Sequence, residues 1–226
     1  MLITYRQALL QGMRELLQND PKVFLIGVGL SDPNAVFGTC AGLYREFPGR
    51  VIEAPLAEGM LTGLIFGAAL VGMKPILIHS RINFAFLGMD QIINHIIAWP
   101  KMFPNHPPIQ LMIRGVAGQE GWGNGAQHLG DYQQLFQALE IDLYLPATAR
   151  TVRLSLETWH QNKRPAIFID YKEFYDDYYD LSSGHRFSDP LPHVTDYLRF
   201  PNQKPKPHLT LHEAWQMGYA AGKETL

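Results

Sequence analysis

Three side chains that could move protons or stack on a ring follow three successive predicted strands. Glu58 begins a glycine-rich apolar segment after the second predicted strand, Phe84 follows the third, and His128 closes a glycine-rich loop after the fourth. Ligands of open parallel sheets bind beyond the carboxyl ends of the strands. A carboxyl group and an imidazole at that edge are suited to acid–base catalysis. These three residues are therefore candidates for a site at this edge.

Each of the three residues also has an ordinary structural interpretation. A carboxylate at the start of a helix, as at Glu58, can simply interact with the helix dipole. An aromatic side chain such as Phe84 commonly belongs to the core. His128 could be a surface histidine or one whose hydrogen bonds are satisfied within the fold. Residue type alone leaves both interpretations open.

Strand-like and helix-like segments alternate along most of the chain. Helical periodicity predicts helices over 5–18, 58–71, 88–103, 131–139 and 149–161, and apolar runs predict strands over 23–28, 51–54, 75–79, 109–115, 143–146 and 166–171. Such alternation with short connections is typical of βαβ units. We expect an α/β fold with a doubly wound, mainly parallel sheet and helices on both faces.

The domain organisation changes near residue 172. Residues 1–172 are predicted to form one domain, whose long loop over 116–130 is glycine-rich and therefore expected to be functional. Residues 173–226 are proline-rich and lack a core pattern, so we expect an irregular C-terminal arm with a possible closing helix over 209–221.

Charge and composition exclude several classes of function. The chain has 19 Lys and Arg against 21 Asp and Glu, giving a net charge of −2 without a basic block, which argues against nucleic acid and anionic membranes as partners. The apolar segment 61–73 is too short to span a bilayer, and the N-terminus does not resemble a signal peptide. We expect a soluble, cytoplasmic protein. The single cysteine, Cys40, excludes an internal disulfide framework, and no motif predicts a metal site in this chain.

An ordered set of motifs resembles the pyrimidine-binding domain of thiamine-diphosphate enzymes. The segments at 3–9 (ITYRQAL), 50–59 (RVIEAPLAEG), 67–75 (GAALVGMKP), 89–94 (MDQIIN) and 121–128 (GWGNGAQH) are similar, in particular, to the β subunit of the 2-oxoacid dehydrogenase decarboxylating component, an oxidoreductase. The likeness covers about residues 3–172.

This resemblance implies a role for four residues. Glu58 matches the carboxyl group that hydrogen-bonds a ring nitrogen of the cofactor pyrimidine and so promotes the imino tautomer that deprotonates the thiazolium carbon. Phe84 matches the aromatic that stacks on the pyrimidine, and Leu56 the residue whose backbone lies beside it. His128 matches a histidine that faces the substrate and the acyl acceptor, where it would transfer protons or stabilise charge.

The resemblance also implies a partner. The diphosphate and its Mg²⁺ need a motif that begins Gly-Asp-Gly, which is absent here and belongs to the α-type subunit in this family. We therefore expect a heterotetramer with an α-type subunit, in which thiamine diphosphate with Mg²⁺ is bound between the chains. The expected reaction is the decarboxylation of a small 2-oxo acid, followed by transfer of the resulting acyl or aldehyde unit. A split transketolase-type ketol transferase and a non-catalytic structural or regulatory subunit remain alternatives.

Three features depart from the family pattern. No transketolase-type C-terminal domain follows the last predicted strand, the segment 27–29 (GVG) replaces an acidic pattern, and Leu87 stands where the dehydrogenases carry glutamine. These departures concern the lipoyl-linked dehydrogenase reaction more than cofactor activation.

Overall fold

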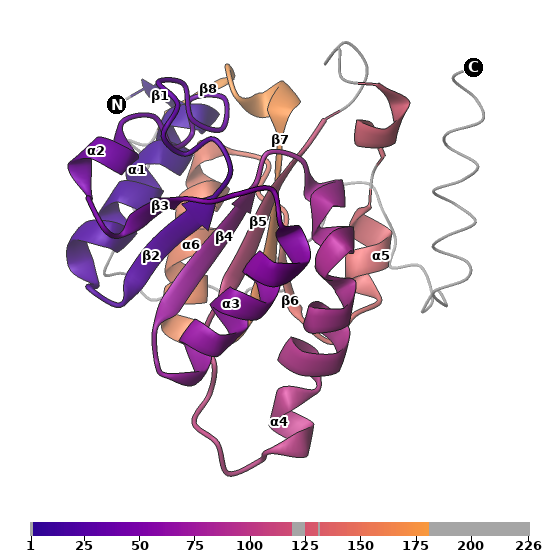
Figure 1. Ribbon diagram of the computed structural model, residues 1–226. Coiled ribbons are helices and arrows are strands. Elements are labelled where there is room, and N and C mark those ends of the chain that lie inside the picture. The colour runs from indigo at the N-terminus through magenta and orange to yellow at the C-terminus, as the bar shows by residue number, and fades with distance from the viewer. Residues whose placement is uncertain (1, 119–124, 131, 181–226) are drawn as a thin grey trace.

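The protein is a layered α/β structure built on a parallel sheet (Figure 1). The computed structural model describes residues 2–118, 125–130 and 132–180. Within these residues, six parallel strands lie in the order β3-β2-β4-β5-β7-β6: β2 (Val23–Gly27), β3 (Val51–Glu53), β4 (Lys74–His79), β5 (Met112–Ala117), β6 (Asp142–Tyr144) and β7 (Ala166–Tyr171). A separate antiparallel pair joins β1 (Leu2–Thr4) to β8 (Tyr178–Asp180).

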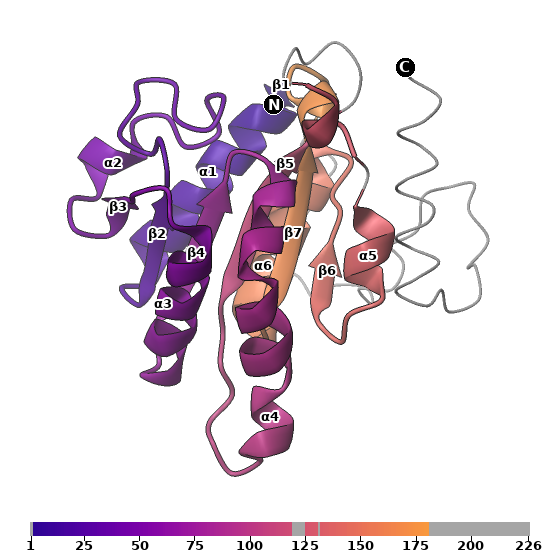
Figure 2. The ribbon, with the colours of Figure 1, turned by 45° about the vertical axis from the view of Figure 1, so that its right-hand side comes forward.

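Helices cover both faces of the sheet, as the sequence predicts (Figures 1 and 2). One face packs against α1 (Tyr5–Asn19) and α6 (Ala149–Asn162). The other packs against α3 (Glu58–Leu70), the 3-10 helix η1 (Ile82–Gly88), the π-helix η2 (Gln91–Ile97) and α5 (Gln133–Gln137). Four short helices lie in connections: α2 (Leu43–Glu46), α4 (Trp99–Met102), η3 (Ala126–His128) and η4 (Lys172–Phe174).

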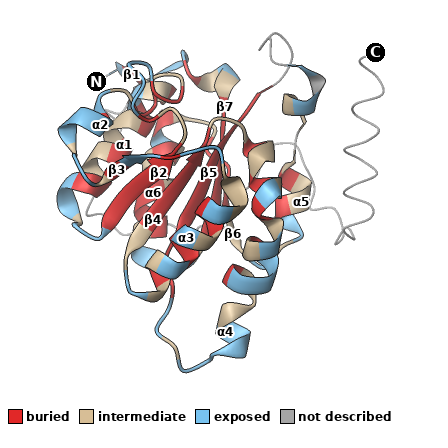
Figure 3. Cartoon of the chain, in the orientation of Figure 1, coloured by how far each residue is buried: buried red, intermediate tan, exposed pale blue. Residues whose placement is uncertain are grey.

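The strands divide the core into two halves. Side chains alternate along each strand, so Val23 and Leu25 enter the α1 and α6 core whereas Phe24 and Ile26 enter the α3 core. Figure 3 shows the result, a buried sheet between helices whose outer sides are exposed. Both faces of the strands are covered, which explains why their sequences are almost continuously apolar.

A buried ion pair links the neighbouring strands β5 and β7 to the loop after β2. Arg114 on β5 donates to both carboxylate oxygens of Asp170 on β7, at 2.9 and 3.0 Å, and its Nη2 donates to Thr39 Oγ1 at 2.8 Å. The hydroxyl of Tyr175 also donates to Asp170. Burial alone would lower the pKa of Arg114, but Asp170 holds that pKa well above its usual value. The guanidinium therefore stays charged and fixes the loop over the sheet.

The segment predicted as a helix over 88–103 is helical, but it is not one regular α-helix. After η1 the chain forms η2 and α4, and the flanking residues Asp90 and Ala98 also have right-handed helical dihedral angles. Pro100 has no N–H to donate, so a regular helix cannot continue through it, and it lies in the first turn of α4 instead. The strand predicted over 109–115 begins later, at Met112, although the preceding apolar residues Ile109 and Leu111 are buried.

The folded unit extends past the predicted boundary at 172. Residues 173–180 were expected to begin an irregular arm, but Tyr175 is fully buried and β8 pairs with β1. The predicted closing helix over 209–221 and the loop residues 119–124 lie outside the described residues. Within the part of the chain that the structure describes, no helix is long and apolar enough to cross a membrane.

Candidate functional site

Glu58 lies at the first position of α3, where the connection from β3 turns onto the sheet. Its backbone carbonyl accepts from Thr62 Oγ1 at 2.8 Å, which belongs to the helix itself. The carboxyl group is half-buried and has no hydrogen-bonding partner among the described residues. No side chain caps the helix at Ala57, so backbone N–H groups of the first turn also stay open. A ligand that carries both hydrogen-bond donors and acceptors could bind both.

Helix α3 and η1 approach each other closely at this end. A Cβ on Gly59 would come within 3.1 Å of the Leu87 carbonyl oxygen, and a Cβ on Gly88 would overlap Thr62 Oγ1. Only glycine permits this approach. The start of α3, with Glu58, is thereby held beside the short helix that carries Phe84.

Phe84 and His128 are in direct contact. Their rings meet edge to face, with centroids 5.4 Å apart and an angle of 68° between the planes. His128 Nδ1 lies 3.1 Å from Asn83 Oδ1, the residue directly before Phe84. Both rings are half-buried. The structure thus brings together two of the predicted residues, from the loops after β4 and β5, but no hydrogen bond or ring contact among the described residues joins them to Glu58.

Leu56 lies in the connection between β3 and α3, and its side chain is 78% exposed. Its neighbour Glu53, at the end of β3, accepts from the backbone N–H groups of Gly29 at 2.7 Å and Ser31 at 2.6 Å. Partial burial opposes ionisation, but these two hydrogen bonds dominate and lower the pKa of Glu53. This carboxylate fixes the loop after β2 against β3, and so shapes the edge on which Leu56 lies.

Sequence reasoning missed two polar residues at this edge. Asn83, directly before Phe84 in η1, was not singled out, and its contact with His128 spans 45 positions of sequence. His79 ends β4 and is only 5% exposed; burial lowers its pKa to about 4, so its ring is neutral at pH 7. A polar side chain at the last position of a buried strand was the available signal for His79.

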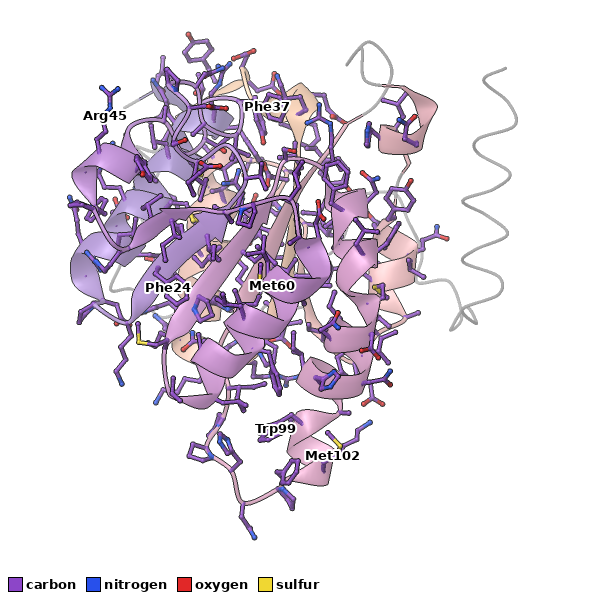
Figure 4. All side chains as sticks on the ribbon, viewed as in Figure 1. Phe24, Phe37, Arg45, Met60, Trp99 and Met102 are labelled. Atoms are coloured by element: carbon purple, nitrogen blue, oxygen red, sulfur yellow. The ribbon has the colours of Figure 1, made fainter. Side chains whose placement is uncertain are left out.

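Two other features do not belong to the site. Cys40 is fully buried, and although Arg114 opposes the effect, burial raises the pKa of its thiol. A hollow of about 370 Å³ is lined by residues such as Trp99, Phe103 and Arg164. Trp99, beside this hollow, and Phe37, in the connection between β2 and α2, lie at opposite ends of the molecule in Figure 4. No cluster of three or more His, Cys, Asp or Glu that could hold a metal exists among the described residues.

The structure is an α/β fold in which Glu58, Phe84 and His128 follow strands of one parallel sheet. The family model "Transketolase, pyrimidine binding domain" matches residues 2–176. The chain belongs to this family, which confirms the resemblance noted in its sequence.

Curated relatives are β subunits of pyruvate dehydrogenase. The mitochondrial "Pyruvate dehydrogenase E1 component subunit beta" of Saccharomyces cerevisiae is 30% identical over 182 residues, covering 80% of this chain and 50% of that protein. The Rickettsia bellii subunit of the same name is 29% identical over 186 residues, covering 81% of this chain and 57% of that protein. The chain therefore spans about half the length of the curated relatives it matches.

A solved structure named "Split gene transketolase, inactive beta4 tetramer" has the same fold. It superposes with a TM-score of 0.60 at 21% sequence identity, covering 75% of this chain and 51% of that one. At this identity the likeness concerns the fold alone.

Proposed function

We propose that this chain is the pyrimidine-side subunit of a heteromeric thiamine-diphosphate enzyme that decarboxylates a 2-oxo acid and transfers the resulting acyl or aldehyde unit. The observation that carries the proposal is the carboxyl group of Glu58. It lies half-buried at the carboxyl edge of the sheet, beside the helix that bears Phe84, with no partner among the described residues. Membership of the pyrimidine-binding family supports the same cofactor.

The residues of this edge fit one half of the cofactor. An aminopyrimidine is a flat ring with hydrogen-bonding nitrogens, and the edge offers an aromatic ring at Phe84 and a carboxyl group at Glu58 without competing protein partners. The diphosphate and Mg²⁺ find no counterpart, because the sequence lacks the Gly-Asp-Gly motif and the described residues contain no metal-ligand cluster. The other half of the site must come from an α-type partner subunit.

Each residue of the edge then has a defined task. Bound thiamine diphosphate supplies a carbon nucleophile that attacks ketone carbonyls. The Glu58 carboxyl group would hold its proton in a hydrogen bond to a ring nitrogen of the pyrimidine, and Phe84 would pack against the ring and exclude water. The backbone of Leu56 would border the same ring. His128 would take up or return a proton on the substrate side.

The outer side of α3 supports the need for a partner. After Glu58, this helix contains no charged residue, and a helix that is apolar all round is normally covered on all sides. Met60 and Leu64 on α3 are 53% and 43% exposed, and Met60 is labelled in Figure 4. Leu56, just before the helix, and Leu87, on the adjoining η1, are 78% and 63% exposed. We name these four residues, from α3 and the two segments beside it, the α3 stripe. Because it adjoins Glu58, a partner docked on it would close the cofactor site.

The catalytic proposal is tested by Glu58→Gln in the complex reconstituted with the partner that carries the diphosphate motif. Glutamine keeps the size but cannot hold the carboxyl proton, so we expect turnover to fall at least about a hundredfold. The matched control is Glu140→Gln, an exposed glutamate at the opposite end of the fold whose ion pair with Lys101 is on the surface. Unchanged turnover in Glu58→Gln would refute the role.

The partner and the substrate class need separate measurements. Leu64→Asp on the α3 stripe should abolish assembly in sedimentation analysis, whereas Met102→Asp, an equally exposed residue on α4, should not. Donor specificity follows from which compound the complex consumes. Consumption of a 2-oxo acid supports the proposal, and consumption of a ketose phosphate with an aldose acceptor would assign ketol transfer instead. A partner equally active without this chain would indicate a non-catalytic subunit.

A further inference from the structure

The imidazole of His128 is held on one nitrogen by a neutral acceptor. His128 Nδ1 lies 3.1 Å from the side-chain oxygen of Asn83, and an amide oxygen can only accept a hydrogen bond. Nδ1 must therefore carry the proton. We propose that Asn83 is a positioning residue that fixes His128 in its Nδ1–H tautomer and directs the lone pair of Nε2 into the site.

The surroundings restrain the ring in its plane as well. Phe84, the next residue in η1, meets the imidazole edge to face at 5.4 Å, so two consecutive residues contact the same ring. The backbone N–H of His128 donates to the Gly125 carbonyl at 3.1 Å, and Gly125 has a φ of 81°, which glycine adopts readily. His128 Nε2 has no hydrogen-bonding partner among the described residues. It is the one position of this ring left for a ligand.

The tautomer determines what His128 can do, given the proposed function. With the proton on Nδ1, the neutral ring accepts a proton at Nε2 from a substrate or acceptor group. The ring is then an imidazolium with both N–H groups, and the same proton leaves from Nε2 when it is returned. Asn83 keeps its hydrogen bond throughout, because an amide cannot take the Nδ1 proton or neutralise the ring charge. His128 therefore acts first as a base and only then as an acid.

The tautomer can be measured on the chain alone, without cofactor or partner. In a ¹⁵N-histidine sample above the titration range, long-range ¹H–¹⁵N correlation distinguishes a protonated Nδ1 from a protonated Nε2, and His128→Gln assigns the signal. We expect the proton on Nδ1 in the native chain and in Asn83→Asp, which retains an acceptor oxygen. In Asn83→Leu, which has a similar size and no acceptor, the ring should revert towards the Nε2–H form. Asn94→Ala is the matched control, because Asn94 in η2 donates to Asp90 at the start of the same helix and has no hydrogen bond to His128 among the described residues.

Two results overturn the inference. A native His128 with its proton on Nε2 would mean that the Asn83 amide donates rather than accepts. An unchanged tautomer in a folded Asn83→Leu chain would mean that the ring is held by other contacts.

The kinetic consequence is measured in the reconstituted complex. A wrong catalytic tautomer costs up to about 10⁴ in known triads. The ring in Asn83→Leu still samples the correct form, so we expect kcat to fall roughly tenfold to a hundredfold, with donor KM within about twofold and Asn83→Asp closer to native. If Asn83→Leu is fully active while Glu58→Gln is inactive, the positioning role of Asn83 is refuted and the proposed function is not. Absence of any thiamine-dependent activity would refute the proposed function and leave the tautomer result standing.

Discussion

Replacing Asp170 by Asn should strongly destabilise the fold. Asn has the shape of Asp but no charge. The fully buried Arg114 would therefore lose the negative charge of the carboxylate to which it donates and would remain an uncompensated cation. Breaking a buried pair in this way costs about 3–5 kcal/mol. In a chain of this size each kcal/mol lowers the Tm by about 2–4 °C, so we expect a fall of roughly 6–20 °C.

The measurement is urea unfolding and thermal denaturation of the native and variant chains under identical conditions. The control is Glu46→Gln, which breaks the half-exposed Arg14–Glu46 pair at 2.8 Å and should cost less than about 1 kcal/mol. A double variant, Arg114→Met with Asp170→Leu, removes both charges and should be more stable than Asp170→Asn alone. An Asp170→Asn chain that loses no more stability than the surface control, or a double variant that is the least stable of the three, would contradict this expectation.

Substitutions at Asp20 and at the glycines of α3 and η1 should change stability in directions that the structure predicts. Burial alone would raise the pKa of Asp20, but hydrogen bonds from Lys74 at 2.7 Å and His160 at 2.9 Å lower it to about 2. The carboxylate therefore stabilises the fold at pH values above its unfolded pKa. In urea unfolding, Asp20→Asn should be less stable than the native chain at neutral pH, and the difference should shrink as the pH falls from about 4 to about 2. A difference that does not change with pH would contradict this. Gly88→Ala should lower the free energy of unfolding by about 1–3 kcal/mol, because its Cβ would lie 2.9 Å from Thr62 Cβ. Gly67→Ala in α3 has no atom within 4 Å of its Cβ and should raise the free energy of unfolding by about 0.5–1 kcal/mol, because alanine loses less backbone entropy on folding. Equal thermal stability of these two variants would contradict the close approach of α3 and η1.

The sequence predicts local elements well where one periodicity dominates. Helix α1 begins at Tyr5 as expected because Thr4 and Gln7 cap each other reciprocally, with Thr4 Oγ1 accepting at 3.1 Å and Gln7 Oε1 at 2.8 Å. The segment 88–103 is helical, as its apolar pattern predicts, but it divides into η2 and α4, and Pro100, which has no N–H to donate, lies in the first turn of α4. The periodicity of side chains did not predict this division.

Contacts between distant segments could not be predicted in the same way. Arg114 and Asp170 lie within apolar strands, and their meeting depends on the register of β5 against β7, which pairs Val116 with Asp170. The rule for parallel sheets predicts that Phe84 and His128 lie at one edge, but their contact also requires η3 to pack against η1. The local sequence pattern predicts which residues lie at the carboxyl edge of the sheet, but not which of them contact each other.

The α3 stripe bears on how this polypeptide must be produced. Its leucine and methionine side chains are as available to a second identical chain as to any other protein, and such a face in water favours self-association. Under the proposed function, chains made in excess of the partner are therefore expected to pair among themselves or aggregate. Synthesis of the two polypeptides in matched amounts would keep the apolar side of α3, which has no charged residue after Glu58, covered.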